Sequence, residues 1–436
     1  MHPTDALYDF AQRYLPGGVC ASARANAALG HPFYVSRGDG PFVYDLDGRE
    51  YVDMCLSHGA SLLGHNHPRL KAAVQQALEL GIICSYETEH HSRLAARLAE
   101  MVPCAEMSRF AGSGTETVMH AVRLARAVTG RMKLIKFEGH FHGYADSVYH
   151  SSAPRVDQAG PAEAPITIAE SAGMPAHERE LVIVVPFNDP VALEQAFARH
   201  AAESAALILE PVNYDSGCIL PEPGFLQTCR ALCDRYGMLL VFDEVLTAFR
   251  FHPGCAQGYY GVTPDLAVLG KALGGGVPIS AICGRREVML GYRPTGDCEH
   301  SGTYLAHLTT VLGAVAALDE YSQPGFYPRL NALAERFYAG FRELIARSGV
   351  PMQLQTMGPR FGMYFGVTEP VRNYRQAARQ DRGMLLAFVR GCIERGVYFH
   401  VAAHHGLSAA HTEAELDRAL AAIEGALGDV ARGAAL

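Results

Sequence analysis

A single lysine stands in a context that suits covalent chemistry. Lys271 follows the apolar segment Leu266–Leu269 and precedes three consecutive glycines, Gly274–Gly276. A lysine amine that burial removes from water loses its proton more easily and becomes a nucleophile, able to form a Schiff base with a carbonyl. The alternative is a lysine at a strand end whose amine extends to the solvent. The neighbours of Lys271 alone leave both interpretations open.

An acidic pair ends another apolar segment. Asp243 and Glu244 directly follow Met238–Phe242. Burying a carboxylate is costly unless it is paired. The partner of Asp243 is therefore either a protonated ring nitrogen of a ligand or a guanidinium such as Arg250, and the sequence favours neither. Glu244 is more typical of a structural acid.

Two glycine-rich segments suit a phosphorylated ring. Gly112–Thr115 comes just before a helical pattern, where backbone N–H groups and the helix dipole attract an anion. A turn capped by a serine or threonine explains the same residues equally well. Phe141 and His142 lie between two glycines at the end of a further apolar segment, which suits stacking on a flat heterocycle.

Short apolar segments that alternate with helical patterns must position these residues. Such alternation, between about residues 105 and 290, predicts a parallel sheet covered on both faces. We expect strands at Lys133–Phe137, Leu181–Val185, Ala206–Leu209, Met238–Phe242, Leu266–Leu269 and Ile279–Ile282. Ligands bind outside the carboxyl ends of such strands. The lysine, the acid, the aromatic residue and the glycine-rich turn would together form a site for a phosphorylated pyridine aldehyde, a cofactor that acts as an electron sink.

The remaining segments predict a smaller α+β domain. Gly40–Asp53 has the pattern of a β-hairpin around an Asp-Gly turn, and His67–Leu80 that of an amphipathic helix. After about residue 305 the pattern is mostly helical. The strands expected there are Met352–Gln355, Phe361–Phe365 and Val397–His400, and the clearest helices are Tyr327–Ser348 and Glu413–Ala431.

Composition excludes several classes of partner. The net charge of −8 argues against nucleic acids and anionic membranes, which require a basic surface. The 11 scattered cysteines predict free thiols in a reducing compartment. The first residues lack the pattern of a secretory signal, and no apolar run approaches the ~20 residues of a membrane span. We therefore expect a soluble cytoplasmic protein.

Paired histidines do not predict a metal site. His140 and His142 are two residues apart, and His404 and His405 are adjacent. A metal site needs a third ligand at a suitable spacing, and neither pair has one. The same holds for the remaining pairs, His65 with His67 and His90 with His91.

Together these motifs resemble the class III, fold-type I aminotransferases that use pyridoxal 5'-phosphate, in particular the glutamate-1-semialdehyde aminomutase-like branch. The resemblance covers nearly the whole chain and is most specific in Asp243, Lys271 and Gly112–Glu116. It implies an α/β fold whose large cofactor-binding domain, residues 56–304, contains a mostly parallel seven-stranded sheet. A segment of residues 1–55 would pack with the small α+β domain, residues 305–436.

The resemblance also assigns roles to individual residues. Lys271 would form the Schiff base and move a proton between substrate and cofactor, while Asp243 would keep the pyridine nitrogen protonated. The further residues that it implies at the cofactor are Ser113, Gly114 and Thr115 at the phosphate, Phe141 and Val245 on the two ring faces, and His142 and Asn213 near the ring. Thr303 would reach the phosphate of a partner subunit, which implies a homodimer with active sites at the interface.

Substrate recognition is where this chain departs from the aminomutase pattern. Arg24 falls where the branch binds a substrate carboxylate, a role that suits a guanidinium. His58 stands in a segment that usually carries a tryptophan, and Val401–Leu407 contains no acid. Arg360 is a candidate for a second carboxylate site. These differences favour an aminotransferase acting on an α- or β-amino acid and a keto acid, with an aminomutase or racemase as the alternative.

Overall fold

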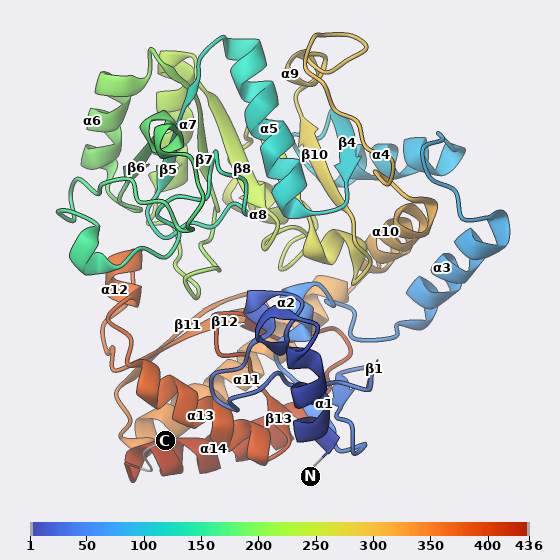
Figure 1. Ribbon diagram of the computed structural model, residues 1–436, viewed down its shortest axis with the longest axis vertical. Helices are drawn as coiled ribbons and strands as arrows, with labels where there is room; N and C mark the ends of the chain where they lie inside the picture. Colours follow the sequence, from blue (N-terminus) through green and yellow to red (C-terminus); the bar gives the residue numbers. More distant parts are fainter. Residues whose placement is uncertain (1–2, 434–436) are drawn as a thin grey trace. The chain divides into compact units, whose positions relative to one another are not determined.

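A seven-stranded sheet organises the larger of two units (Figure 1). The computed structural model describes residues 3–433. The strand order is β4-β10-β9-β8-β7-β5-β6. Their bounds are Met107–Ala111 for β4, Lys133–Phe137 for β5, Val182–Val185 for β6, Ser204–Leu209 for β7, Leu239–Glu244 for β8, Leu266–Leu269 for β9 and Ser280–Gly284 for β10.

Six of the seven strands end at the same edge of this sheet. β10 is antiparallel to both of its neighbours, β4 and β9, and the other neighbouring strands are parallel. Since β4 and β9 each run against β10, they run in the same direction as the rest. The predicted mostly parallel sheet is confirmed. β4 was not among the predicted strands because its polar Ser108 and Arg109 interrupt the apolar pattern, as an edge position allows.

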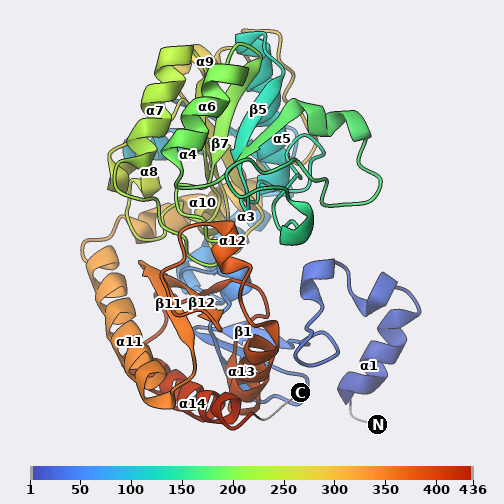
Figure 2. The ribbon, with the colours of Figure 1, turned by 90° about the vertical axis from the view of Figure 1, so that its left-hand side faces the viewer.

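Helices cover both faces of the sheet. Figure 2 shows α5 (Gly114–Thr129) on one face and both α6 (Pro190–His200) and α7 (Phe225–Tyr236) on the other. α5 begins where Ser113 accepts a hydrogen bond from the Glu116 N–H, and it ends at Gly130 with a φ of 68°. Its apolar side chains, among them Val118 and Leu124, are buried against the strands. This packing fixes the start of α5 at the carboxyl edge.

Further helices of the larger unit pack beside the sheet. α10 (Leu308–Tyr321) contacts α3 (Pro68–Leu80), α4 (Glu89–Met101) and the short 3-10 helix η5 (Lys271–Gly274). The remaining short helices of this unit are η3 (Val156–Gln158), η4 (Ala176–Leu181), α8 (Cys255–Tyr260), α9 (Arg286–Met289) and α12 (Tyr374–Ala377). α10 therefore supports the turn on which Lys271 lies.

The smaller unit combines segments that come before and after the main part of the larger unit in the sequence. It contains the described residues up to His67, Pro328–Pro370 and the described residues from Arg379. One sheet has the order β1-β2-β3-β13, the other β11-β12-β14. The strands are β1 (Arg37–Asp39), β2 (Phe42–Tyr44), β3 (Glu50–Asp53), β11 (Met352–Met357), β12 (Arg360–Phe365), β13 (Val397–Tyr398) and β14 (His405–Gly406). β13 pairs in parallel with β3, which joins the early and late parts of the sequence.

Three long helices and several short ones complete the smaller unit. The long helices are α11 (Phe326–Ser348), which starts at the end of the larger unit, α13 (Arg382–Glu394) and α14 (Glu413–Ala431). The others are α1 (Pro3–Gln12), η1 (Pro16–Gly18), η2 (Ser22–Arg24) and α2 (Leu56–Gly59). Phe337, Phe361 and Phe388 are fully buried in the core of this unit.

The two units change over at 67/68 and 327/328, and residues 371–378 belong to the larger one. The boundaries at 55/56 and 304/305 stay a prediction about the domains. All eleven cysteines are free thiols, and most are buried. Among residues 3–433, none of the helices combines the length and the apolarity that crossing a bilayer requires.

Candidate functional site

Several predicted site residues meet at the carboxyl edge of the seven-stranded sheet. Val245, just after β8, lies between two glycines: a Cβ atom would come within 3.0 Å of its side chain if added to Gly114, and within 3.4 Å if added to Gly270. The start of α5 and the residue before Lys271 are therefore both packed against Val245. The acid, the lysine and the glycine-rich turn share one edge of the sheet, as expected for a site at the carboxyl ends of parallel strands.

Asp243 is a buried carboxylate with an imidazole partner. It is 4% exposed, and its Oδ2 atom lies 2.8 Å from Nδ1 of His142. Its Oδ1 atom accepts the Val245 N–H at 3.1 Å. Burial lowers the pKa of His142, which Asp243 opposes only in part, so the ring is neutral and donates its Nδ1–H to the carboxylate.

Lys271 lies on a strained and well-supported turn. Its φ is 45°, a left-handed conformation that costs a non-glycine residue on the order of 1–3 kcal/mol and that clusters at functional sites. Its side chain is half-buried. The carbonyl of the next residue, Ala272, accepts a 2.7 Å hydrogen bond from Tyr321 Oη, which is buried on α10. The turn therefore holds the lysine backbone in a fixed direction.

The turn before α5 already binds a carboxylate. The Gly112 N–H donates to Glu116 Oε2 at 2.9 Å, and Ser113 Oγ accepts the Glu116 N–H at 3.3 Å. The first N–H groups of a helix, here those of Gly114 and Thr115, have no partner within the helix. Gly143 lies against Thr115, since a Cβ atom on Gly143 would come within 2.7 Å of the Thr115 Cα. The turn thus offers donors to an anion next to the loop of Phe141 and His142.

The loop after β5 presents Phe141 and fixes it by its backbone. The Phe141 N–H donates to Glu210 Oε1 at 3.0 Å, and the Glu210 N–H donates to His140 Nδ1, also at 3.0 Å. Asn213 donates to the Gly139 carbonyl at 3.0 Å and to Ser216 Oγ at 3.3 Å. Asn213 thus contacts this loop through the Gly139 carbonyl, and Ser216, which follows Asn213 in the sequence, donates to the same carbonyl at 2.8 Å. A contact of Asn213 with a ligand stays a prediction.

Arg24 and His58 belong to the smaller unit, where both line a cavity of about 470 Å³. Most of its other lining residues are apolar or aromatic: Leu7, Phe10, Tyr14, Val19, Phe33, Tyr34 and Tyr398. Arg24 is exposed, its Nη1 atom lies 2.6 Å from Cys20 Sγ, and no ion pair within residues 3–433 includes it. The ring of His58 lies 4.6 Å from that of His400 and 4.7 Å from that of His404.

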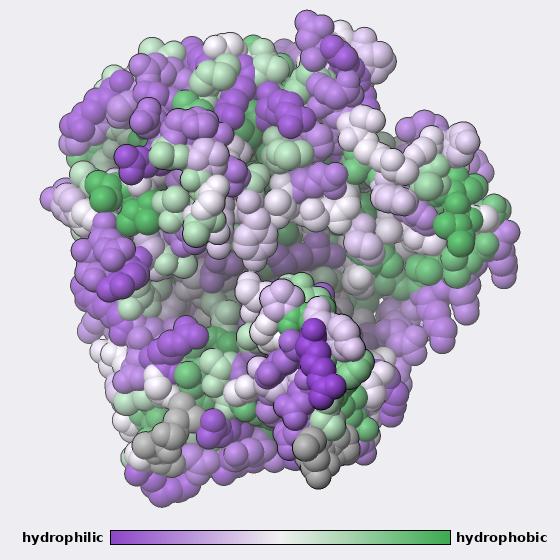
Figure 3. Space-filling view, viewed as in Figure 1, coloured by the Kyte–Doolittle hydropathy of each residue, from purple (hydrophilic) through white to green (hydrophobic). Residues whose placement is uncertain are grey.

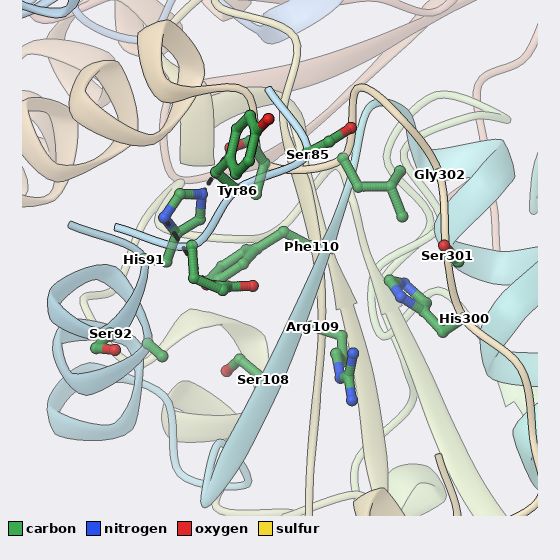
Figure 4. Close-up of a pocket in the computed structure, with 14 residues that line it drawn as sticks. Ser85, Tyr86, His91, Ser92, Ser108, Arg109, Phe110, His300, Ser301 and Gly302 are labelled. Atoms are coloured by element: carbon green, nitrogen blue, oxygen red, sulfur yellow. Dashed lines mark hydrogen bonds and ion pairs between the residues drawn. The ribbon is translucent and has the colours of Figure 1, made fainter. Parts of the chain in front are cut away.

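Thr303 lies beside a second cavity, of about 490 Å³, in the larger unit. Figure 4 shows Arg109 and Phe110 of β4 opposite His300, Ser301 and Gly302. The Thr303 carbonyl accepts a 2.9 Å hydrogen bond from Ser85 Oγ at the same cavity. Figure 3 shows apolar side chains over the end of α3. The large apolar residues that are exposed in and just after α3 are Leu78, Leu80, Ile82 and Tyr86.

Two buried ionisable residues beside this edge were not predicted. Lys136 is the fourth of the five residues of β5, and Glu210 directly follows β7. A lysine inside an otherwise apolar strand was a signal that could have identified Lys136. Glu210 could have been found because, like Asp243, it is an acid at the end of an apolar strand. Within residues 3–433, no group of three or more histidine, cysteine, aspartate and glutamate side chains has the arrangement to hold a metal ion.

Comparison with known proteins gives a consistent result. The sequence profile described as Aminotransferase class-III matches residues 23–409. An omega-transaminase from Sphaerobacter thermophilus is 33% identical, with a TM-score of 0.93 over 98% of both chains. A beta-phenylalanine aminotransferase from Variovorax paradoxus is 30% identical, with a TM-score of 0.87 over 99% of this chain and 94% of that one. A glutamate-1-semialdehyde-aminomutase from Pseudomonas aeruginosa PAO1, at 24% identity and a TM-score of 0.88 over 98% and 94%, shares the fold.

Proposed function

Because the chain belongs to the class III aminotransferases, we propose that it moves an amino group between a carboxylate-bearing amino acid and a keto acid, using pyridoxal 5'-phosphate held on Lys271. The observation that carries this proposal is the common position of Lys271, Asp243 and the Gly112–Thr115 turn at one sheet edge, joined through Val245. A nucleophilic amine, a buried carboxylate and an anion-binding turn are the groups that this cofactor requires.

The chemistry of the donors fits the cofactor. Gly112 already donates its N–H to a carboxylate, so the turn before α5 accepts an anion such as a phosphate. Asp243 accepts a hydrogen bond from the His142 ring, and a carboxylate beside a pyridine nitrogen favours the protonated form of that nitrogen. When bound, pyridoxal 5'-phosphate supplies an electron sink for the bonds at the substrate's amino-bearing carbon.

The protein's own groups have separate tasks in the reaction. Lys271 carries a proton to and from the reacting carbon with its amine, and its strained turn keeps the direction of the side chain defined. Asp243 keeps the ring nitrogen protonated, and His142 orients Asp243. Phe141 and Val245 pack on the two ring faces, while Ser113, Gly114 and Thr115 bind the phosphate. Together these groups exclude water from the reacting atoms.

A chemical test addresses Lys271 directly. The purified protein should absorb in the visible range, and borohydride treatment should fix the cofactor to the peptide that contains Lys271. Lys271→Ala should abolish this labelling, whereas Lys133→Ala, at the start of β5, should leave it intact. Absence of a borohydride-fixed adduct in the wild-type protein would refute the proposal.

The cavity of the smaller unit suggests the kind of amino donor. Arg24 offers a guanidinium to a carboxylate. The cavity has a volume of about 470 Å³ and a largely apolar and aromatic lining, which suits a bulky apolar group. The similar omega-transaminase and beta-phenylalanine aminotransferase support an α- or β-amino acid with such a group as the donor. We therefore propose that Arg24 and His58 contribute to substrate binding.

Incubation with a single substrate separates this proposal from isomerisation. A transaminase stops after one half-reaction unless a keto acid is added, whereas an aminomutase or a racemase continues. Turnover without any added keto acid, measured by chiral chromatography, would therefore contradict an amino-transfer function.

A second copy of this chain is the partner that we propose for the larger unit. The apolar patch at the end of α3 includes Ile82 and Tyr86, both 77% exposed, and Tyr304 is 73% exposed. Such side chains are costly to leave in water and mark protein interfaces. A homodimer in which Thr303 reaches the partner's phosphate site would cover them. We place the enzyme in a reducing cytosol, in agreement with its eleven free thiols.

A further inference from the structure

A fully buried lysine lies on β5, which the strand β7 separates from β8, the strand of Asp243. Lys136 is 0% exposed and is the fourth of the five residues of β5. Its Nζ atom donates to the carbonyls of His140 at 2.9 Å, Val148 at 3.3 Å and His150, and to Ser152 Oγ at 3.2 Å. The three N–H hydrogens of a single ammonium group are thus shared among four oxygen atoms from one stretch of chain. We call these four acceptors the oxygen cage.

The oxygen cage belongs to the loop that carries the cofactor-facing residues. All four acceptors come from residues 140–152, a segment that includes Phe141 and His142. This segment has no helix or strand of its own, so its carbonyls need other donors. A buried carbonyl that loses its donor costs free energy, and four such carbonyl and hydroxyl groups would lose the same donor at once.

Other contacts hold the beginning and the end of this loop. Arg375 forms two hydrogen bonds with the carboxylate of Glu138, at 2.9 and 3.0 Å. Tyr374 Oη donates to the carbonyl of Pro154 at 2.8 Å. These contacts place the loop's beginning and end. Between them, the Phe141 N–H donates to Glu210 and the Ser151 N–H donates to the Ile168 carbonyl at 2.8 Å, whereas Lys136 is the group that contacts four residues of this part at once.

Burial and the nearby carboxylates have opposite effects on the pKa of Lys136. Burial lowers its pKa to about 7, and the carboxylates of Glu170, Glu210, Asp215 and Asp243 act in the opposite direction. Burial and the charge of Lys136 together lower the pKa of His140, His142 and His150. These imidazoles are therefore neutral, which is the form of His142 that donates its Nδ1–H to Asp243.

We propose that Lys136 is a positioning residue for the reaction: its oxygen cage fixes the loop so that His142 meets Asp243 and Phe141 lies at the ring face. The assignment of Phe141 to the cofactor rests on the proposed function, whereas the cage and the His142–Asp243 contact do not. Lys136 acts entirely through other residues and touches no substrate.

Hydrogen exchange of the purified protein, as isolated and after removal of any bound cofactor, tests this proposal. Lys136→Met replaces the ammonium with an apolar group of similar length, and Lys133→Met on the same strand is the matched control, because Lys133 pairs with Glu203 near the surface. We expect amide exchange in residues 138–152 of the cofactor-free Lys136→Met protein to be at least about tenfold faster, with α14 unchanged. The control should match the wild type.

Cofactor binding gives the second measurement. Lys136→Met should weaken pyridoxal 5'-phosphate binding by roughly tenfold or more and shift the visible absorption maximum, since His142 and Asp243 no longer meet correctly. Lys136→Gln, which keeps two N–H donors, should recover part of the exchange protection. If wild type binds no cofactor, the proposed function fails while the exchange result still tests the cage.

Three outcomes would overturn the proposal. The first is an unchanged exchange rate in residues 138–152 of Lys136→Met. The second is faster exchange in this loop with cofactor affinity and absorption unchanged, which would make the cage structural only. The third is uniform loss of protection, α14 included, in both Lys136→Met and Lys136→Gln, which would assign Lys136 to general folding.

Discussion

The sheet edge of the larger unit and the cavity of the smaller unit differ in how firmly their polar groups are held. At the sheet edge, Asp243 has an imidazole and a backbone donor, and Lys136 has four oxygen acceptors. In the cavity, the exposed guanidinium of Arg24 has only a thiol as a hydrogen-bond partner within residues 3–433. We interpret the fixed groups as those of the proposed chemistry and the guanidinium of Arg24 as the group that would pair with a substrate carboxylate.

This difference sets the expected size of each mutational effect. Removing a fixed charge at the sheet edge should reduce the chemical step, because its partners cannot rearrange. Removing a group from the cavity should reduce binding of one substrate and leave the chemical step largely unchanged. Each prediction below therefore tests whether the two regions separate in this way.

The largest effect should come from Asp243→Asn. The amide keeps the shape and can still accept from His142, but it carries no charge to hold a proton on the ring nitrogen. We expect kcat to fall about 100- to 1000-fold, the typical loss for one electrostatic group in a closed site. Stopped-flow kinetics of a single half-reaction will measure it. Asp234→Asn, which changes a largely exposed acid paired with Arg230 on α7, is the control.

A change in kcat of less than about threefold in Asp243→Asn would contradict the comparison, because the most firmly held carboxylate would then be dispensable. A raised KM with unchanged kcat would have the same meaning. In both cases Asp243 would belong to the structural acids, together with Glu244, whose carboxylate accepts from Thr247, Ala256 and Gln257.

The next largest effect is expected for Arg24→Ala. Loss of a charged hydrogen bond should lower kcat/KM for a carboxylate-bearing donor by about 2–3 kcal/mol, mainly through KM. A donor amine without a carboxylate should be affected much less. Steady-state kinetics with both donors, and with Arg13→Ala as a surface control from the same unit, will show the difference. An unchanged KM for the acid would remove Arg24 from substrate binding.

The sequence predicted the strands and the shared sheet edge, but not the partners of Lys136 or the lining of the cavity. Mostly apolar segments predicted six of the seven strands. Because ligands bind at the carboxyl ends of parallel strands, Asp243 and Lys271 were also predicted to share one edge of the sheet. The partners of Lys136 could not be predicted, because they are backbone carbonyls in a loop without regular structure. The cavity around Arg24 was equally hidden, since its lining comes from residues as far apart in sequence as Leu7 and His400.

His400 shows why the orientation of Arg24 needs three-dimensional information. Its Nε2 atom lies 3.0 Å from the carbonyl of Ala23, the residue before Arg24, and its Nδ1 atom accepts the Ala402 N–H at 3.1 Å. Burial lowers the pKa of His400, so the ring is neutral and donates from Nε2. The backbone of η2 is therefore positioned although the guanidinium is not.

A smaller effect should appear in the pH dependence of stability. The pKa of Lys136 is about 7 in the folded protein and near 10.5 in the unfolded chain. Between these values the unfolded state binds more protons, so unfolding free energy rises with pH. The difference between wild type and Lys136→Met should increase by at most about 1.4 kcal/mol per pH unit from pH 7 to 10. Urea unfolding at several pH values measures this; a flat difference would mean that the oxygen cage keeps Lys136 charged throughout.

The smallest effect is expected for His58→Asn, which tests the cavity of the smaller unit. His58 has a φ of 56°, a conformation that asparagine adopts more readily than most residues, so the backbone should survive the change. The substitution removes the ring that lies near His400 and His404. We expect kcat to stay within about twofold and KM to change a few-fold, with a different order of preference among bulky donors, because the substitution alters the lining of the cavity that we assign to the donor. A large fall in kcat with every donor would show that His58 acts on the chemical step, and the cavity would then be as firmly coupled to chemistry as the sheet edge.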